Sequence, residues 1–365
     1  MNGTRRQVFA LIALCAFVLA GGWGWQHWRH AVVPLGPQRH VLTRNPKVGV
    51  HTRLENEVEP WKIKKSLVMV RELGTPWVVE YFPWAFSEPR PGHYDFSHAD
   101  LVVNHAHRQG LTVIARLGLV PEWARPRDTT STYLAPDAYP AFADYAAAFV
   151  RHFQGRVRYV ILWNEPNLAL EWGYRAPDAA SYTQMLCTAA TAIRAANPDV
   201  VILAGALAPT LGDPTGELGV GDLDFLSEMY DAGAASCFDA LAVHAYGLTF
   251  PPEDAPDLQV LNFRRVELLR QMMVARGDAD KPIHITEAGW NDHPRWTRAV
   301  RPAQRIRYTV RACEMAEVWP WLASLNFWVF RYPVPEKSFR DYYTFVSTDF
   351  QPKPLYLELQ QALRP

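Results

Sequence analysis

Two short stretches carry the strongest structural signal: Ile-Leu-Trp-Asn-Glu-Pro-Asn at residues 161–167 and Ile-His-Ile-Thr-Glu-Ala-Gly-Trp at residues 283–290. Each is an apolar, β-branched run that ends in a glutamate, Glu165 in the first and Glu287 in the second. Such a run predicts a buried strand, so each glutamate should stand at the C-terminal end of a strand. In a barrel of parallel strands, that end carries the reactive side chains.

Strand-like and helix-like stretches alternate along the rest of the chain. Apolar runs predict strands at residues 48–51, 77–84, 111–117, 157–163, 200–207, 238–244, 282–286 and 322–330. Helical spacing of apolar residues follows each run, at 59–73, 95–110, 140–153, 180–196, 223–232, 258–276, 303–318 and 355–363. Eight such units predict an α/β protein with a closed parallel barrel, a (β/α)8 TIM barrel. A chain of 365 residues accommodates this barrel as a single catalytic domain.

An apolar segment precedes the predicted barrel. Arg5 and Arg6 stand before an apolar run at residues 8–20, and Gly-Gly-Trp-Gly-Trp follows at 21–25. The pattern is that of a signal peptide or of an uncleaved transmembrane anchor with tryptophans at its outer end. We expect residues 1–25 to be one of these, 26–46 a linker and 47–365 the barrel. Either way the barrel is exported: anchored to a membrane with the catalytic domain outside, or secreted or periplasmic after cleavage.

Charge and cysteine content exclude several functions. Lys plus Arg and Asp plus Glu number 37 each, so the net charge is zero and nothing indicates nucleic acid binding. Neither a metal-ligand pattern nor a glycine-rich phosphate loop is present, so we expect no cofactor. We also expect a monomer. Cys187, Cys237 and Cys313 are an odd, widely spaced set, which favours buried unpaired thiols, although one bonded pair stays open.

The two glutamate motifs resemble those of the clan A glycoside hydrolases. Trp163-Asn164-Glu165-Pro166-Asn167 is similar to the clan's Asn-Glu-Pro acid/base motif after strand four, and Ile285-Thr286-Glu287 is similar to its nucleophile motif after strand seven. The first motif most resembles family 39, which includes bacterial exopolysaccharide glycosidases, and family 5 cellulase-like enzymes come second. The resemblance covers residues 48–361. It implies a retaining glycosidase that cleaves O-glycosidic bonds of a polysaccharide or oligosaccharide.

The resemblance also implies a role for each motif residue. Glu165 would protonate the leaving oxygen and later activate water, while Glu287 would attack the anomeric carbon and form a covalent intermediate. Asn164 would donate a hydrogen bond to the sugar 2-hydroxyl. Retention requires the two carboxyl groups to lie about 5–5.5 Å apart, a separation that sequence spacing does not reveal.

Further candidates for substrate binding stand at the ends of other predicted strands. His244 and Tyr246 would orient Glu287 or bind a sugar hydroxyl, and Trp328 would form an aromatic platform for a sugar ring. The remaining candidates are His51, Glu80, Trp84 and Trp290. For each of these residues the competing interpretation is a role in packing.

One departure from the family pattern concerns the support of Glu287. Related enzymes commonly carry an arginine late in strand two, but residues 77–84 contain none, and Val79 occupies the expected position. Arg116 in the third predicted strand would replace it if its side chain points into the barrel. The missing arginine motivates an alternative function, a catalytically silent barrel that binds carbohydrate or acts as a scaffold at the cell surface. The sequence specifies neither the sugar, the linkage, endo or exo action, nor hydrolysis over transglycosylation.

Overall fold

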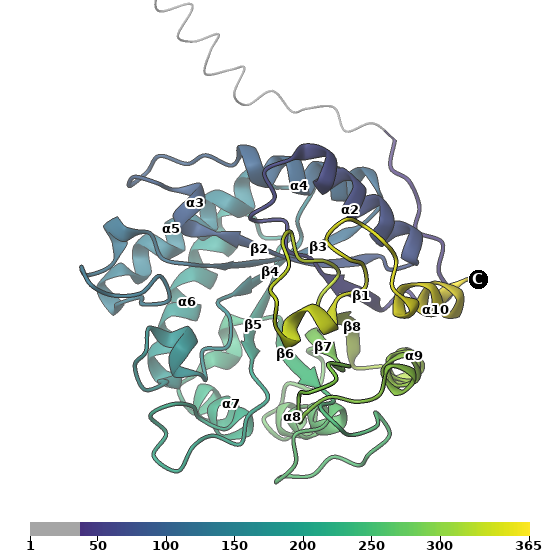
Figure 1. Cartoon of the computed structure of the whole chain (residues 1–365). Helices are drawn as coiled ribbons and strands as arrows, with labels where there is room; N and C mark the ends of the chain where they lie inside the picture. Colours follow the sequence, from purple (N-terminus) through teal and green to yellow (C-terminus); the bar gives the residue numbers. More distant parts are fainter. Residues whose placement is uncertain (1–36) are drawn as a thin grey trace, which may run out of the picture. The chain divides into compact units, whose positions relative to one another are not determined.

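The computed structural model describes residues 37–365, and these residues form a closed barrel of eight parallel strands (Figure 1). The strands are β1 (Val48–His51), β2 (Trp77–Pro83), β3 (Thr112–Gly118), β4 (Tyr159–Leu162), β5 (Val201–Leu207), β6 (Ala240–Tyr246), β7 (Ile283–Gly289) and β8 (Leu322–Phe327). Each strand pairs with its neighbours in sequence, and β1 pairs with β8 to close the ring. The predicted (β/α)8 barrel is confirmed.

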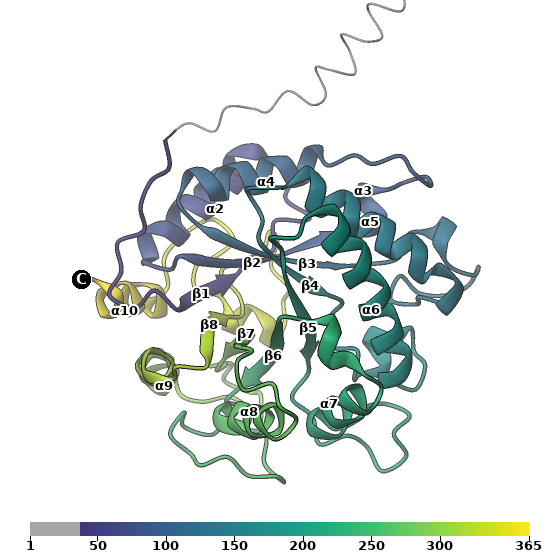
Figure 2. The same cartoon turned by 180° about the vertical axis from the view of Figure 1, so that it is seen from behind.

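Helices surround the ring of strands (Figures 1 and 2). They are α2 (Pro60–Leu73), α3 (Trp84–Ser87), α4 (Ser97–Arg108), α5 (Tyr139–His152), α6 (Ala179–Ala196), α7 (Asp222–Asp231), α8 (Val266–Ala275), α9 (Pro302–Val318) and α10 (Pro354–Leu363). The segment that follows β8, drawn in yellow, lies in front of the strands in Figure 1 and behind them in Figure 2. Figure 1 therefore looks onto the C-terminal mouth of the barrel.

One predicted helix is longer than the helix in the structure. The predicted helix at 258–276 begins only at Val266, because the Arg265 guanidinium donates to the carbonyls of Asp257 and Leu258 and holds the preceding segment as a loop.

The predicted signal peptide or anchor at 1–25 lies outside the described residues. Among the helices that the structure describes, none has the length and apolar character needed to cross a bilayer.

Part of the predicted linker at 26–46 packs on the barrel. The Arg39 amide donates to the Arg108 carbonyl at 2.9 Å, and the Arg44 amide donates to the Leu363 carbonyl at 3.0 Å. Asn45 is buried, and its Nδ2 donates to the Cys313 carbonyl at 2.8 Å. The compact unit therefore begins at Gln38, ahead of the predicted boundary at residue 47.

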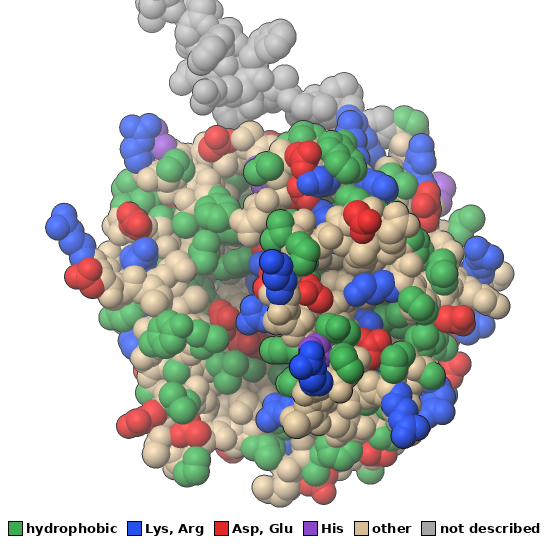
Figure 3. Space-filling model, in the orientation of Figure 1, with side chains coloured by type: hydrophobic (Ala, Val, Ile, Leu, Met, Phe, Trp, Pro, Cys, Tyr) green, Lys and Arg blue, Asp and Glu red, His purple; other side chains and the backbone are tan. Residues whose placement is uncertain are grey.

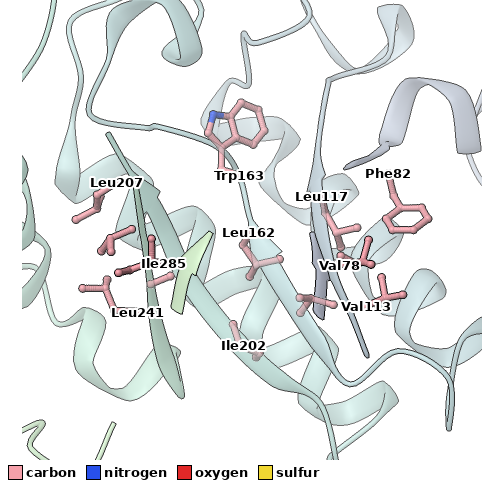
Figure 4. Packing of buried hydrophobic residues seen from close by; sticks show 14 of the residues in the cluster. Val78, Phe82, Val113, Leu117, Leu162, Trp163, Ile202, Leu207, Leu241 and Ile285 are labelled. Atoms are coloured by element: carbon pink, nitrogen blue, oxygen red, sulfur yellow. The ribbon is translucent and has the colours of Figure 1, made fainter. Parts of the chain in front are cut away.

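The strands present side chains alternately to two cores, as the period of two requires. The core inside the ring consists of Val79, Ile114, Ile161, Leu203, Ala206, Ala240 and Ala242. A larger core lies between the strands and the helices, and Figure 4 shows part of it, including Val78, Val113, Leu162, Ile202 and Leu241. The parity of a position within its strand thus decides whether the side chain faces the barrel interior or the helices.

Cys187 of α6 and Cys237 of a short 3-10 helix (Ala234–Cys237) form a disulfide bond, while Cys313 is free and buried. The favoured prediction of unpaired thiols is wrong for the first two residues. Their separation of 50 positions carries no pairing signal, because the contact arises only when the 3-10 helix folds back onto α6.

We expect the double substitution Cys187→Ser and Cys237→Ser to lower the free energy of unfolding by about 2–4 kcal/mol, because the bond restricts the unfolded chain across 50 positions. Urea unfolding without reductant measures this loss. Wild-type protein in reductant should match the double variant, and Cys313→Ala should keep the sensitivity to reductant. An unfolding free energy that reductant leaves unchanged would contradict a stabilising bond.

Candidate active site

Glu165 lies in a tight turn that follows the end of β4. Trp163 and Glu165 have φ angles of 90° and 43°, in the left-handed region that residues other than glycine seldom occupy. The Trp163 amide donates to the Leu117 carbonyl at 3.0 Å, and the Glu165 amide donates to the Ala206 carbonyl at 2.8 Å. Neighbouring strands on both sides therefore hold this turn, and strained backbone of this kind concentrates at functional sites.

Glu287 lies within β7, because this strand continues to Gly289 rather than ending at the glutamate. Ile283 and Ile285 belong to the core on the helix side, so regular alternation would turn Glu287 toward the helices as well. Register shifts on both edges of β7, before Glu287 and before Ala288, insert one residue and reverse the alternation. Glu287 thereby pairs with His244 of β6 and faces the mouth of the barrel.

The side chains of Glu165 and Glu287 converge on His244. Nδ1 of His244 lies 2.7 Å from Oε1 of Glu165, and Nε2 lies 3.7 Å from Oε1 of Glu287. One oxygen of each carboxyl group and one nitrogen of His244 lie within 4.8 Å of one another. Figure 3 shows a hollow on this face with acidic side chains at its floor and hydrophobic side chains around it. Among the described residues, this trio alone is compact enough to share a metal ion.

Arg116 supplies the positive charge that β2 lacks. It stands two positions after Ile114 of the inner core, so the alternation of β3 points it into the barrel. Its Nη1 donates to Oε1 of Glu287 at 2.7 Å. The Tyr246 hydroxyl donates to the other oxygen, Oε2, at 2.8 Å. Both oxygens of Glu287 are therefore held in place.

These neighbours keep Glu287 ionised. Burial alone would raise its pKa, but the charges of His244 and Arg116 outweigh burial and lower the pKa of Glu287 to about 2. Burial and Arg116 hold the pKa of His51 well below its usual value, so this ring is neutral near pH 7. Burial and the charge of Glu287 raise the pKa of Tyr246 well above its usual value, so its hydroxyl remains a donor.

A third carboxyl group, Glu171, lies in the same site, and the sequence analysis missed it. It belongs to a 3-10 helix, η3 (Ala169–Trp172), which follows β4. The Asn164 side chain and the charges of Glu165 and Arg116 act on its ionisation. Burial and, second, the charge of Glu165 raise the pKa of Glu171 to about 7. The only signal in the sequence is a carboxylate shortly after the motif, and its meaning depends on how the loop turns.

Trp328, which follows β8, and His51 of β1 pack against each other beside Glu287. Their rings lie 4.5 Å apart edge to face, and Nε2 of His51 is 3.7 Å from Oε1 of Glu287. The Trp328 indole donates to the Tyr332 hydroxyl at 3.1 Å. Aromatic residues packed in one cluster form a wall here: Tyr246, Trp296, Trp328, Tyr332 and Tyr343.

Glu80 does not reach the hollow, so its predicted contact with substrate is wrong. It lies on the same face of β2 as Val78 and Phe82, which belong to the helix-side core, and it is fully buried. Its carboxyl group accepts hydrogen bonds from Thr52 Oγ1 at 2.5 Å and from the Leu54 amide at 3.0 Å. Glu80 therefore anchors the loop after β1.

Trp84 and Trp290 are also packing residues, contrary to the prediction. Trp84 is 0% exposed and stacks on Tyr145, with ring centres 5.8 Å apart. Trp290 is 1% exposed, and its indole donates to the Phe250 carbonyl at 2.7 Å. Tryptophan near a strand end is ambiguous in sequence, because the same side chain suits a core and a sugar platform.

Comparisons with known proteins agree with this architecture. A family model described as beta-galactosidase, Glyco_hydro_42, matches residues 56–131, and no curated protein matches. A solved family 39 glycoside hydrolase from Bacteroides cellulosilyticus is 19% identical with a TM-score of 0.70, over 87% of this chain and 63% of that chain. This chain thus spans less than two thirds of that protein's length.

Two further solved structures show the same likeness. A GH39 β-xylosidase from Caulobacter crescentus is 20% identical with a TM-score of 0.64, over 89% of this chain and 72% of that chain. A GH5_18 protein from Streptomyces cattleya is 15% identical with a TM-score of 0.64, over 88% of this chain and 80% of that chain. The predicted resemblance to clan A glycoside hydrolases of families 39 and 5 is confirmed, and the barrel is the fold that they share.

We expect Glu171→Gln to stabilise the protein at about pH 8 but not at about pH 4. A carboxyl group whose pKa rises from 4.5 to about 7 on folding holds its proton more tightly in the folded state, so its contribution to stability falls as the pH rises between these values. Glutamine does not ionise, so at about pH 8 the free energy of unfolding of the variant should exceed that of wild type by roughly 1–3 kcal/mol. Urea unfolding across this pH range measures the difference.

The matched control is Glu358→Gln, which removes an exposed carboxyl group on α10. A stability difference between Glu171→Gln and wild type that is the same at every pH would contradict the assignment of a raised pKa to Glu171.

Proposed function

We propose that this protein is a retaining glycoside hydrolase that cleaves O-glycosidic bonds of a polysaccharide or oligosaccharide by double displacement. One observation carries the proposal: oxygens of Glu165 and Glu287 lie within 4.8 Å of each other in one hollow. Retaining enzymes hold their carboxyl groups about 5–5.5 Å apart, whereas inverting enzymes separate them by about 6.5–9.5 Å to admit a water. The close spacing supports retention.

In the first step Glu287 acts as the nucleophile. Its carboxylate forms a bond to the anomeric carbon while the glycosidic bond breaks, and Glu165 transfers its proton to the leaving oxygen. Arg116 and Tyr246 hold the nucleophile ionised and aligned before the attack. The product of this step is a glycosyl ester of Glu287.

In the second step Glu165, now ionised, takes a proton from water, and the water oxygen attacks the anomeric carbon as the ester bond to Glu287 breaks. The His244 ring holds Oε1 of Glu165 at 2.7 Å, which orients it for both proton transfers. A sugar hydroxyl in place of water would give transglycosylation by the same route.

Unsatisfied polar atoms support a hydroxyl-rich ligand. Nε2 of His51 and Nε2 of His244 are buried without a hydrogen-bond partner, and each lies 3.7 Å from Oε1 of Glu287. A buried polar atom without a partner costs free energy, which a bound sugar hydroxyl would recover. Trp328 stands beside them as the surface on which a sugar ring would stack.

Export of the barrel is also part of the proposal. The bond between Cys187 and Cys237 supports it, because disulfides persist in oxidising compartments outside the cytosol. The alternative of a catalytically silent barrel rested on the missing arginine in β2, and the contact of Arg116 with Glu287 removes that ground.

We expect Glu165→Ala and Glu287→Ala each to reduce kcat by roughly 10⁴-fold on aryl β-glycosides, and azide to distinguish the two roles. In Glu287→Ala, azide should enter the vacated space and displace the phenolate in one step, giving a glycosyl azide of inverted configuration. In Glu165→Ala, azide should attack the glycosyl ester and give the retained azide.

The substrates are 2,4-dinitrophenyl β-glycosides of xylose, glucose, galactose and mannose, and NMR identifies the azide product. Glu122→Gln, which removes an exposed carboxyl group after β3, is the control and should behave as wild type. If wild-type protein turns over a substrate but Glu287→Ala forms no azide, the nucleophile is another residue. If wild-type protein cleaves neither these glycosides nor polysaccharides, the proposed function is wrong.

We expect Arg116→Met to move the acidic limb of the kcat/KM profile to higher pH by roughly 1–3 units. Burial raises the pKa of Glu287 and the charge of Arg116 lowers it, so removing the guanidinium should raise this pKa. Glu287 must be ionised to attack, so activity should be lost at a higher pH. Measuring kcat/KM against pH for wild type, Arg116→Met and Arg116→Lys tests this, and the lysine variant should retain part of the acid tolerance. An equal loss at every pH would instead indicate a role confined to packing.

A further inference from the structure

The stretch from residue 52 to residue 61 carries two side chains that the proposed reaction does not use, Arg53 and Trp61. It leads from β1 into the first turn of α2, so it lies at the C-terminal mouth of the barrel. Its Glu57 forms an ion pair with Arg331 of the segment after β8, and both partners are buried. The segment after β8 also lies beside α2 in both views of the fold (Figures 1 and 2). The stretch is therefore fixed to its neighbour at the mouth.

Arg53 is held beside Trp328 by contacts that leave part of its guanidinium available. Its Nε donates to Oε1 of Glu55 at 2.6 Å. Its Cζ lies 5.7 Å from the ring centre of Trp328 and 5.9 Å from that of Tyr332. The Arg53 side chain is 31% exposed. Because the contact with Glu55 uses Nε, the Nη groups remain as donors for a ligand at the mouth.

Trp61 presents a fixed aromatic ring to solvent. Of the tryptophans that the structure describes, it alone is more than half exposed, at 53%. Its indole donates to Oε1 of Glu59 at 3.1 Å, and its ring packs on Phe350 with ring centres 5.8 Å apart. Phe350 is itself buried, and the Cζ of Arg331 lies 4.2 Å from its ring centre. The Trp61 ring is thus oriented by the buried residues behind it.

The surroundings of Trp61 suit a saccharide better than a protein partner. Lys62 pairs with Glu59, and its Nζ lies 5.7 Å from the Trp61 ring centre. Val58 is the only other exposed large apolar side chain between residues 52 and 61. A specific protein interface buries roughly 1,200–2,000 Å², with few charged residues at its centre. A sugar needs only one ring for its C–H face and polar groups beside it for its hydroxyls, and this surface has both.

Both side chains lie on the glycone side of the site, the side of the sugar that becomes bonded to Glu287. Contacts lead outward from Glu287: Nε2 of His51 lies 3.7 Å from its Oε1, the His51 and Trp328 rings lie 4.5 Å apart, and Arg53 lies beside Trp328. Glu165 protonates the leaving oxygen and follows β4, which lies across the closed ring from β8. The leaving group therefore departs toward β4, and the glycone extends toward β8 and β1.

We propose that Arg53 and Trp61 bind sugars farther along the glycone, so that the enzyme cuts within a polysaccharide and releases oligosaccharides. This inference rests on the proposed function. The sugar bonded to Glu287 stacks on Trp328, the Nη groups of Arg53 donate to hydroxyls of the next sugar, and Trp61 stacks on a sugar beyond it. Because both side chains are held in place before a ligand binds, little conformational freedom is lost on binding.

The test compares three kinds of substrate: the polysaccharide that wild type cleaves, oligosaccharides of increasing length prepared from it, and the matching 2,4-dinitrophenyl monoglycoside. Trp61→Ala should lower kcat/KM on the polysaccharide by about 5–50-fold, through a higher KM, because a remote contact binds ground state and transition state equally. On the monoglycoside the loss should stay below about 2-fold, because this substrate does not reach the ring. Arg53→Met should show its loss at shorter chain lengths than Trp61→Ala.

Trp61→Phe is the matched variant, because it keeps an aromatic face, and it should stay within about 5-fold of wild type on the polysaccharide. Val318→Ala is the control, since Val318 is an exposed apolar residue at the end of α9 that leads into β8, away from the mouth. Equal losses of Trp61→Ala on the polysaccharide and the monoglycoside would overturn the inference. Release of monosaccharides alone from the polysaccharide would overturn it as well.

A second arm needs no turnover. Native electrophoresis through gels that contain soluble β-glucan, xylan, mannan or galactan should retard wild type in at least one gel, and Trp61→Ala should lose most of this retardation. If wild type is retarded but cleaves no glycoside, the proposed function fails and the saccharide-binding role of Trp61 remains. If wild type cleaves glycosides but neither variant changes retardation or polysaccharide cleavage, the inference fails and the proposed function stands.

Discussion

Arg116 and Glu287 bury a guanidinium and a carboxylate 2.7 Å apart at the mouth of a closed barrel. Neither charge would be tolerated there alone, because removing one partner of a buried pair leaves an uncompensated charge and costs roughly 3–5 kcal/mol. The pair therefore requires that β3 and β7 be held in register across the ring. Closure of the barrel supplies this, since each strand is fixed by neighbours on both edges.

The irregularities of the barrel occur where the site needs them. The inserted residue in β7 directs Glu287 toward the mouth of the barrel. After β4, the positive φ angles of Trp163 and Glu165 place the Glu165 side chain at the same mouth. Each departs from ideal geometry at some cost, and each is held by hydrogen bonds to adjacent strands. The regular remainder of the barrel thus stabilises two local distortions, and these bring together carboxyl groups from strands that are not neighbours.

The architecture and the convergence of Glu165 and Glu287 were predictable, because apolar runs report buried strands and parallel strands share one functional end. The prediction for Glu287 nevertheless lacked one feature, the residue inserted in β7. Without this insertion, the alternation of side chains would have turned Glu287 toward the helices. The prediction for Glu80 was wrong because Glu80 lies on the face of β2 that packs against the helices. The sequence alone does not show which face of a strand points into the barrel. Glu171 and the pairing of Cys187 depend on how loops fold back, and local patterns do not encode this.

The balance of charge at the mouth links the remaining features. One guanidinium faces three carboxyl groups, Glu165, Glu171 and Glu287, and it contacts Glu287 directly. Burial and the charge of Glu165 raise the pKa of Glu171 to about 7, whereas the pKa of Glu287 is lowered. Double displacement needs one ionised and one protonated carboxyl group at the same time. The cluster meets this requirement because Arg116 donates to Glu287 and so selects the acid that remains ionised.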